Sequence, residues 1–407
     1  MRLHANQGGK TMLGGNFLGR AGASFAALIA VFVLFAASAA QAQQPIVIGA
    51  SVSQTGPLAV DAAYHLRGLQ LGVADANAHG GWLGRKIELK YYDDQSNPGT
   101  AVRLYTRLIT EDNVNLVVGP YSSGISQAVA PLMNKYERVM PAPGASLPAI
   151  FAPGNKWNFQ LLPPATGYLE GILPLAKSQG AHTVAILELQ LGFTLACGQA
   201  REAQAQALGM PIIYGASYAL PQPDFSSLAL AIKNANPDVV VLCSYYPDAV
   251  GIAQALHRIG YAPRFLSETI GPAEAEFISA LGPIANGIIS NTSWWPNLKT
   301  PDNAGFIARY KAMFNNEEPD YHVAATYAAI QVLGAAVKAT NSLDQAKMRQ
   351  WLLTHEVETV EGVFKSDANG LSTKFGQYMF QIQNGKRFLI WPISQAEAKT
   401  QIPYTGQ

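Results

Sequence analysis

The strongest constraint on the fold is an alternation, from Ile46 onward, of short apolar runs with segments long enough for a helix. In the first set, strands are expected at 46–50, 87–92, 115–119 and 139–142, and helices at 62–78, 99–111 and 123–136. Continuous apolar strands joined by crossover helices are typical of a buried parallel sheet. The first set therefore predicts a parallel α/β domain.

The same alternation then begins again. Strands are expected at 183–188, 211–214, 238–243, 265–266 and 287–290, with helices at 194–208, 225–234 and 249–259. After Trp294 come helices at 301–314, 321–340 and 342–354, followed by strands at 362–364 and 378–383. Two successive sets predict two doubly wound domains of similar build. The Pro- and Gly-rich stretch 161–167 is the expected first crossover between them.

Composition excludes several classes of protein. The chain has 407 residues, of which 49% are hydrophobic and 10% aromatic, so it is too apolar to be disordered. Its 28 Lys and Arg nearly balance its 27 Asp and Glu, which argues against nucleic acid as a partner. Two cysteines are too few for a disulfide framework or a Cys-rich zinc site.

The first 42 residues have the three parts of a secretory signal. Arg2, Lys10 and Arg20 occur without any acidic residue, an apolar run covers 21–37, and small residues surround Ala42. We expect cleavage after Ala42 and an exported, soluble product, with no later segment apolar enough to span a membrane. The alternative is a retained membrane anchor, because the apolar run is nearly long enough to cross a bilayer.

In open α/β sheets, ligands bind beyond the carboxyl ends of the strands. The loop at 118–124 follows the third expected strand and contains Tyr121, Ser122 and Ser123 at the start of a helix. A helix start offers free N–H groups and a positive dipole end, which suits a carboxylate. The alternative is an ordinary serine N-cap. A second N–H-rich turn, Gly144-Ala145-Ser146, follows the next strand and favours an anion-binding wall.

In the second set, Tyr245 and Tyr246 follow the strand that ends at Cys243, and Glu268 and Thr269 follow the next strand. The tyrosines could offer ring faces with polar tips to a ligand, or could pack between the domains. Glu268 could pair with a ligand ammonium, or could be solvated on a loop. Cys197 and Cys243 fall in the same expected sheet, where a disulfide and two buried thiols are both open alternatives.

Signatures of catalysis and of metal binding are missing from the sequence. It has no Gly-x-Ser-x-Gly elbow, no His-Glu-x-x-His and no Gly-x-Gly-x-x-Gly after a strand. The six histidines after residue 42 include no pair at metal-ligand spacing. We therefore expect neither an enzyme, nor a metal site, nor a cofactor.

Several motifs occur in order along the chain: 46–49, Thr55-Gly-Pro-Leu, 75–89, Tyr92-Asp-Asp-Gln, Val118-Gly-Pro-Tyr-Ser-Ser and Asp320-Tyr with Thr326-Tyr-Ala-Ala. Taken together, they resemble the leucine/isoleucine/valine-binding protein family, the periplasmic receptors of branched-chain amino-acid ABC importers. The resemblance runs from Ile46 to Trp391 and keeps the motif order. It implies a type I periplasmic binding protein fold with a hinge. The expected N-terminal lobe is 43–163 plus 294–375, and the C-terminal lobe is 164–293 plus 376–407.

The resemblance also implies roles for individual residues. Ser123 aligns with a serine that holds the ligand carboxylate, Gly144 and Ser146 with groups that assist it, and Tyr245 with a tyrosine of the closing domain. Tyr321 aligns with an aromatic residue of the side-chain pocket. The family's acid for the ligand α-ammonium aligns with Thr269, so either Glu268 replaces it or the ligand lacks an amine. The family's small disulfide in the first domain is missing.

Two functions remain open on this basis. The first is a monomeric substrate-binding protein that closes around a small carboxylate, either an amino acid or an amine-free aromatic or aliphatic acid, and delivers it to a membrane permease. The second is a periplasmic sensor with the same fold that reports to a membrane signalling partner. An exported hydrolase has only scattered Ser, His and Asp residues to support it.

Overall fold

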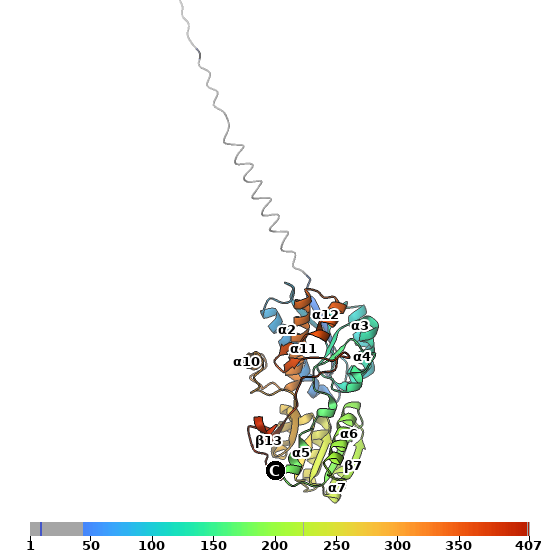
Figure 1. Ribbon diagram of the computed structural model, residues 1–407, viewed down its shortest axis with the longest axis vertical. Coiled ribbons are helices and arrows are strands. Elements are labelled where there is room, and N and C mark those ends of the chain that lie inside the picture. Colours follow the sequence, from blue (N-terminus) through green and yellow to red (C-terminus); the bar gives the residue numbers. More distant parts are fainter. Residues whose placement is uncertain (1–8, 10–43, 223, 405, 407) are drawn as a thin grey trace, which may run out of the picture. The chain divides into compact units, whose positions relative to one another are not determined.

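The computed structural model describes residue 9, residues 44–222, residues 224–404 and residue 406. Apart from Gly9, the expected export signal at 1–42 lies outside the described residues. Residues from Pro45 onward form one unit by their internal contacts. Figure 1 shows this unit coloured along the chain.

The first sheet has three parallel strands in the order β2-β1-β3, as the apolar runs predict. They are β1 (Ile46–Val52), β2 (Ile87–Asp93) and β3 (Leu116–Val117). The helices between and after them are α2 (Ala59–Ala78), α3 (Pro98–Thr110) and α4 (Ser123–Tyr136). A separate parallel pair, β4 (Met140–Ala142) with β5 (Asn158–Gln160), follows. β5 was not expected from the sequence, because its one apolar residue, Phe159, lies between Asn158 and Gln160 and forms no apolar run.

The second sheet has seven strands in the order β14-β13-β10-β9-β8-β6-β7. Five of them are parallel: β6 (Val184–Leu189), β7 (Ile212–Tyr218), β8 (Val239–Cys243), β9 (Phe265–Glu268) and β10 (Ile289–Thr292). The helices of this set are α5 (Ile172–Ser178), α6 (Gly192–Ala207), α7 (Ser226–Ala235), α8 (Tyr246–Arg258) and α9 (Ala275–Leu281). The short helices α5 and α9 were not expected.

Strand β7 is longer than the apolar run at 211–214 predicts. It lies at the edge of the sheet, and its residues from Ile212 to Ser217 alternate between half-buried and exposed. An edge strand with one solvated face does not need a continuous apolar run. The full length of β7 is therefore indicated by the alternation of half-buried and exposed residues, and not by an apolar run.

The chain completes the second sheet with an antiparallel hairpin made of β13 (Tyr378–Gln383) and β14 (Lys386–Trp391). Asn384 and Gly385, which join them, both have positive φ angles, of 51° and 70°. Asn-Gly between alternating apolar residues is a strong hairpin signal. The sequence analysis missed β14 even though this signal was present.

The remaining elements lie between β10 and β13 in the sequence. They are α10 (Asn303–Met313), α11 (Tyr321–Thr340), α12 (Gln345–Thr354), β11 (Val357–Thr359) and β12 (Gly362–Phe364). Single 3-10 turns occur at Pro148–Phe151, Ala165–Gly167, Gly271–Ala273, Gly282–Ala285 and Ile393–Gln395.

Helix α11 is the central helix of the core and packs along α2 (Figure 1). A Cβ atom at Gly68 of α2 would lie 2.7 Å from the carbonyl oxygen of Val323, so only glycine allows this approach. Among the described residues, α11 alone is long and apolar enough to cross a membrane, contrary to our expectation of no such segment after residue 42. Its apolar window is 72% buried inside the fold, as in the core helix of a soluble protein.

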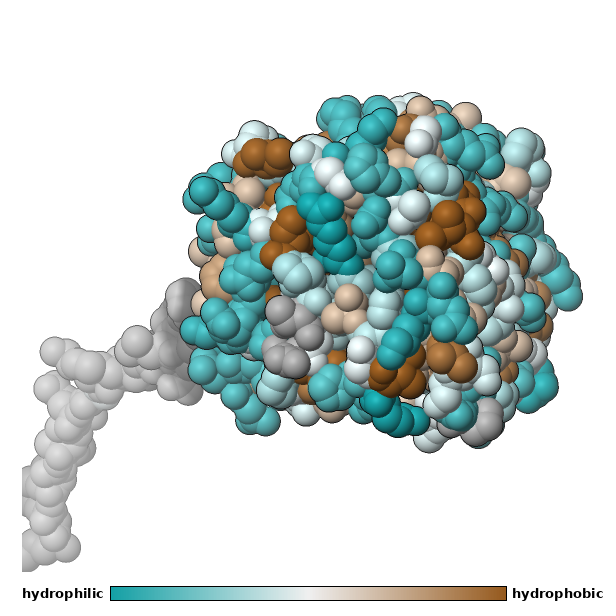
Figure 2. Space-filling model, turned by 90° about the horizontal axis from the view of Figure 1, so that it is seen from below, coloured by the Kyte–Doolittle hydropathy of each residue, from teal (hydrophilic) through white to brown (hydrophobic). Residues whose placement is uncertain are grey.

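The two cysteines are free thiols, and both are buried. On the face shown in Figure 2, hydrophilic residues predominate and hydrophobic residues form small separate groups.

Candidate functional site

A small cavity lies where loops of the first sheet meet loops of the second. Its volume is about 10 Å³, room for about one water molecule. Six of the eleven residues singled out from the sequence line it: Tyr121, Ser123, Gly144, Ser146, Tyr245 and Tyr321. The strand-end loops at 118–124 and 141–146, and the start of α11, therefore converge on one point.

The hydroxyl of Ser123 accepts two hydrogen bonds and is left free to donate one. Its Oγ accepts hydrogen bonds from the backbone N–H groups of Ser146, at 3.0 Å, and of Leu147, at 3.2 Å. A serine hydroxyl has two acceptor lone pairs and one donor hydrogen. Since both lone pairs are occupied, the hydrogen remains available for an acceptor in the cavity. The side chain is 2% exposed, so few water molecules compete for it.

The two loops approach each other closely. A Cβ atom at Gly144 would lie 2.8 Å from the carbonyl oxygen of Pro120 and 2.9 Å from the Cα atom of Tyr121, so glycine is required there. Ser146 Oγ lies 2.9 Å from the Tyr168 hydroxyl, within hydrogen-bond distance. Ser123 is also the first residue of α4, whose N-terminal dipole favours a negative charge nearby.

Three other predicted residues lie beside the cavity rather than on its wall. Ser122 takes the N-cap position of α4 but makes no capping hydrogen bond with its side chain. Ser122 and Tyr245 both border a neighbouring pocket of about 220 Å³. Ala145 is fully buried between Gly144 and Ser146. Tyr246 is half-buried at the first position of α8.

Glu268 and Thr269 are not among the residues that line the cavity. The Thr269 hydroxyl accepts from the N–H of Ser244 at 2.8 Å and donates to the carbonyl oxygen of the same residue at 2.6 Å. Glu268 ends β9 with its side chain fully buried and without a hydrogen-bond partner among the described residues. Burial raises its pKa well above the ordinary value, and Asp248 contributes to the same shift. The strand register thus holds both residues inside the second sheet.

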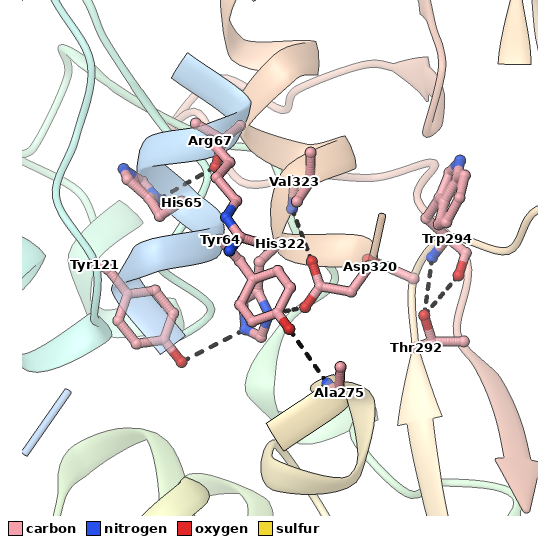
Figure 3. A network of polar contacts seen from close by, with 12 residues as sticks. Tyr64, His65, Arg67, Tyr121, Ala275, Thr292, Trp294, Asp320, His322 and Val323 are labelled. Carbon is pink, nitrogen blue, oxygen red and sulfur yellow. Dashed lines mark hydrogen bonds and ion pairs between the residues drawn. The ribbon is translucent and has the colours of Figure 1, made fainter. Parts of the chain in front are cut away.

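His322 is the most informative lining residue that the sequence analysis missed. It belongs to the first turn of α11, where the Asp320 carboxylate accepts from its Nδ1 at 2.8 Å (Figure 3). Nε2 then faces the Tyr121 hydroxyl at 3.5 Å. Asp320 also accepts from the backbone N–H of Val323 and so caps the helix. Asp at an N-cap two residues before His was the signal available in the sequence.

Apolar side chains complete the wall. Leu162, Tyr168, Phe193 and Ile270 all line the cavity and were not predicted. The Phe193 ring lies edge-on to Tyr168, at 4.9 Å between centroids, and to Tyr245, at 5.6 Å. The cavity therefore combines hydroxyl and N–H donors on one side with aromatic rings on another, an arrangement suited to a small amphipathic anion.

Asp248 holds Tyr245 in place. Its carboxylate accepts from the backbone N–H of Tyr245 at 3.0 Å and from the Tyr218 hydroxyl at 2.6 Å. Burial raises the pKa of Asp248 from 3.8 to about 7. The folded chain therefore retains a proton that the unfolded chain releases, and this contribution to stability is complete below the ordinary pKa and is lost as pH rises through the raised one.

This pKa shift makes a prediction for Asp248→Asn, which resembles the protonated form. Between about pH 5 and about pH 8, the melting temperature of the variant should rise relative to that of the wild type, because only the wild type loses the proton. Paired thermal melts across this range provide the check. A constant difference between the two proteins would contradict the raised pKa.

Tyr64 of α2 joins the first set of elements to the second. Its hydroxyl donates to Glu276 Oε2 at 2.6 Å. The same hydroxyl accepts from the backbone N–H of Ala275 at 3.2 Å (Figure 3). Tyr64→Phe removes both bonds and should weaken the contact between α2 and α9 by about 0.5–1.5 kcal/mol per neutral bond, and by more for the bond to the carboxylate. Thermal melts should show the loss of stability, with Tyr92→Phe, whose hydroxyl bonds to Asp112 on the first sheet side, as the control for a lost tyrosine hydroxyl. An unchanged melting temperature in Tyr64→Phe would show that this contact does not stabilise the fold.

No group of three or more His, Cys, Asp or Glu in the described part of the chain is arranged to hold a metal ion.

The chain is similar in sequence to a known protein family. Residues 45–387 match the family model described as periplasmic binding protein. An amino acid binding protein of Pseudomonas aeruginosa is 26% identical over 333 residues, which cover 80% of this chain and 87% of that protein.

Solved structures share the fold. One is the branched-chain amino acid transporter substrate-binding protein LivJ from Streptococcus pneumoniae, in complex with isoleucine. It superposes with a TM-score of 0.77 at 23% identity, and the match covers 88% of this chain and 100% of the LivJ chain. A solute-binding protein of an R. palustris ABC transporter, in complex with 4-hydroxybenzoate, has a TM-score of 0.74 at 20% identity and covers 88% and 98%. At these identities the likeness concerns the fold alone.

Proposed function

The chain belongs to the periplasmic binding protein family, and from this premise we propose that it captures a small carboxylate ligand for an ABC importer. Family members bind ligands and do not catalyse reactions, so the chain is a substrate-binding protein rather than an enzyme. The ligand classes named for its relatives are amino acids and, for one solved structure, 4-hydroxybenzoate. We infer that the ligand of this chain comes from the same chemical range.

The geometry of Ser123 carries the proposal. Its Oγ has both lone pairs occupied by backbone N–H groups, which leaves its hydrogen for an acceptor outside the loop. We infer that the hydroxyl of Ser146 and the start of α4 assist. A carboxylate at this point would receive a hydroxyl hydrogen bond and the favourable end of the helix dipole.

We further propose that binding occurs by closure of two lobes about a hinge. The N-terminal lobe would comprise 43–163 plus 294–375, and the C-terminal lobe 164–293 plus 376–407. The cavity holds about one water molecule, so an amino acid or aromatic acid requires the lobes to separate before it can enter. A ligand that contacts both lobes then stabilises the closed state over the open one. The closed form would be the state that a membrane permease receives, in the periplasm after removal of residues 1–42.

A thermal-shift screen of the mature protein tests the proposal. The panel contains amino acids, aromatic acids and short aliphatic acids. A ligand at 100 times its Kd stabilises a protein by about 2.7 kcal/mol, which is readily measured. We expect at least one carboxylate to raise the melting temperature. If neutral sugars or polyamines stabilise the protein and no carboxylate does, the proposed ligand class is wrong.

A further inference from the structure

A second, larger pocket adjoins the cavity, and Tyr321 lines both of them. The volume of this pocket is about 390 Å³, whereas that of the cavity is about 10 Å³. In Figure 3, Tyr121 on the wall of the cavity and Trp294 on the wall of the pocket lie on opposite sides of Asp320. Small-molecule sites have volumes of about 300–1,000 Å³. The pocket is therefore large enough for a small organic molecule in the structure as it stands, and the cavity is not.

Apolar and aromatic side chains form most of the wall of this pocket. Trp295 stacks on Phe380, with 5.8 Å between the ring centroids and 27° between the ring planes. Trp294 and Tyr321 add two further rings, and Ile278 of α9 adds an aliphatic side chain. Flat aromatic molecules bind favourably against such rings, because stacking adds to the gain from burying apolar surface. The wall therefore favours an aromatic ligand.

Arg387 on the same wall has a buried donor without a partner. It is the second residue of β14, and its Nε donates to the carbonyl oxygen of Pro272 at 2.8 Å. Its Nη2 is buried and has no hydrogen-bond partner among the described residues. Burial lowers the pKa of Arg387, but a guanidinium keeps its charge in proteins. An anionic ligand group would supply the partner that the chain does not provide.

The two acidic residues on the wall of the pocket already have other partners. Glu318 Oε1 lies 2.5 Å from Lys311 Nζ, and Asp320 Oδ2 accepts from His322 Nδ1 at 2.8 Å. Asp320 and the acids at the start of α9 act on Arg387 through space. In the described part of the chain, however, no carboxylate forms a hydrogen bond with Nη2 of this residue. The position in front of Nη2 is therefore open to a carboxylate from a ligand.

We propose that this pocket is a second binding site, separate from the cavity at Ser123, and that it binds an aromatic carboxylate. The carboxylate accepts from Arg387 Nη2, and the aromatic ring packs against Trp295 and Phe380. Lys386, which is exposed and also lines the pocket, adds a second positive charge. The inference goes beyond the proposed function and does not depend on it, because none of these four residues of the pocket lines the cavity.

The experiment uses 4-phenylbutanoate as the probe, because it combines a phenyl ring with a carboxylate on a flexible chain. Its amide, 4-phenylbutanamide, has nearly the same shape and no charge. Isothermal titration calorimetry on the mature protein measures the affinity for each. We expect the acid to bind about tenfold or more tightly than the amide, as for a hydrogen bond between two charged groups.

Arg387→Gln should weaken binding of 4-phenylbutanoate about 10- to 100-fold, because it removes the donor and the charge together. Arg349→Gln is the matched control. The Nε of Arg349 also donates to a backbone carbonyl oxygen, that of Lys156 at 2.6 Å, but this residue does not line the pocket. Ser123→Ala changes the cavity and not the pocket. Both Arg349→Gln and Ser123→Ala should bind the probe as the wild type does.

Lys386→Gln provides a second test that does not depend on a buried residue. Its side chain is exposed, so the change should leave the fold intact. We expect it to weaken binding of 4-phenylbutanoate about two- to fivefold, as for an exposed pair of opposite charges. Should Arg387→Gln fail to fold, an unchanged affinity in Lys386→Gln would count against the proposed site.

Three results would overturn the second site. They are no binding of 4-phenylbutanoate to the wild type at millimolar concentrations, equal affinities for the acid and the amide, and wild-type affinity in folded Arg387→Gln. Equal weakening by Arg387→Gln and Ser123→Ala would show that the pocket and the cavity are not separate sites. None of these results affects the proposed function, which would fail instead if no carboxylate bound in a way that Ser123→Ala weakens.

Discussion

Ser123→Ala is expected to weaken binding of a carboxylate ligand by about 1.5–3 kcal/mol, the contribution of a hydrogen bond to a charged group. The hydroxyl that is lost lines the cavity and is left free to donate its hydrogen, because both lone pairs accept from the N–H groups of Ser146 and Leu147. The same change leaves these two N–H groups without a partner and should lower the free energy of unfolding by about 1–3 kcal/mol. Calorimetry and urea denaturation measure the two effects separately.

Ser126→Ala is the matched control for this experiment. Ser126 lies on the same helix, is fully buried, and donates from Oγ to the carbonyl oxygen of Pro120 at 3.0 Å, but it does not line the cavity. It should lose stability without losing ligand affinity. If both variants lose affinity equally, Ser123 acts through the stability of α4 rather than by contact with the ligand.

Trp294→Ala should give the largest loss of stability, about 3–5 kcal/mol, as for other large aromatic residues removed from a core. Trp294 follows β10 and is 2% exposed. Its indole Nε1 donates to Asn303 at 2.8 Å, and its ring lies edge-on to Phe306. Its backbone is tied to the Thr292 hydroxyl (Figure 3). The residue therefore fixes the segment that leaves the second sheet for α10. Denaturant unfolding provides the measurement.

Trp295 serves as the comparison, since the two tryptophans are adjacent and chemically identical. Trp295 is 9% exposed, stacks on Phe380 and donates to Glu397. Both residues border a pocket of about 390 Å³. Trp295→Ala should cost clearly less stability than Trp294→Ala because it opens a site that solvent already reaches. Equal losses would show that the indole of Trp294 has no special role in the core.

The local pattern of apolar and polar residues was sufficient to predict the main helices and strands. Continuous apolar runs such as 238–243 correspond to central strands, and the expected helices at 123–136 and 321–340 have the observed bounds. The comparisons confirm the expected family and the type I fold. Two short elements were missed for different reasons. β5 has one apolar residue between two polar ones, and the seven residues of α9 contain too little periodicity to be distinguished from a loop.

Part of the candidate site could also be predicted from the sequence. The rule that ligands bind beyond strand ends singled out the loops of Ser123 and Ser146, which the structure brings together. His322 and Phe193 were missed because they reach the cavity only through tertiary packing of α11 and α6. Glu268 was singled out because it directly follows a strand. Strand counting does not reveal side-chain direction, and the structure buries this side chain fully at the end of β9, away from the residues that line the cavity.

The most direct test of the central claim compares one acid with its own primary amide. The acid with the largest thermal shift and its amide have nearly the same shape and differ in the negative charge. Calorimetry on the wild-type protein should show the amide binding at least about tenfold more weakly, since Ser123 and the start of α4 favour an anion. Equal affinities would contradict the account, because the cavity would then recognise the shape of the ligand but not the negative charge of its carboxylate.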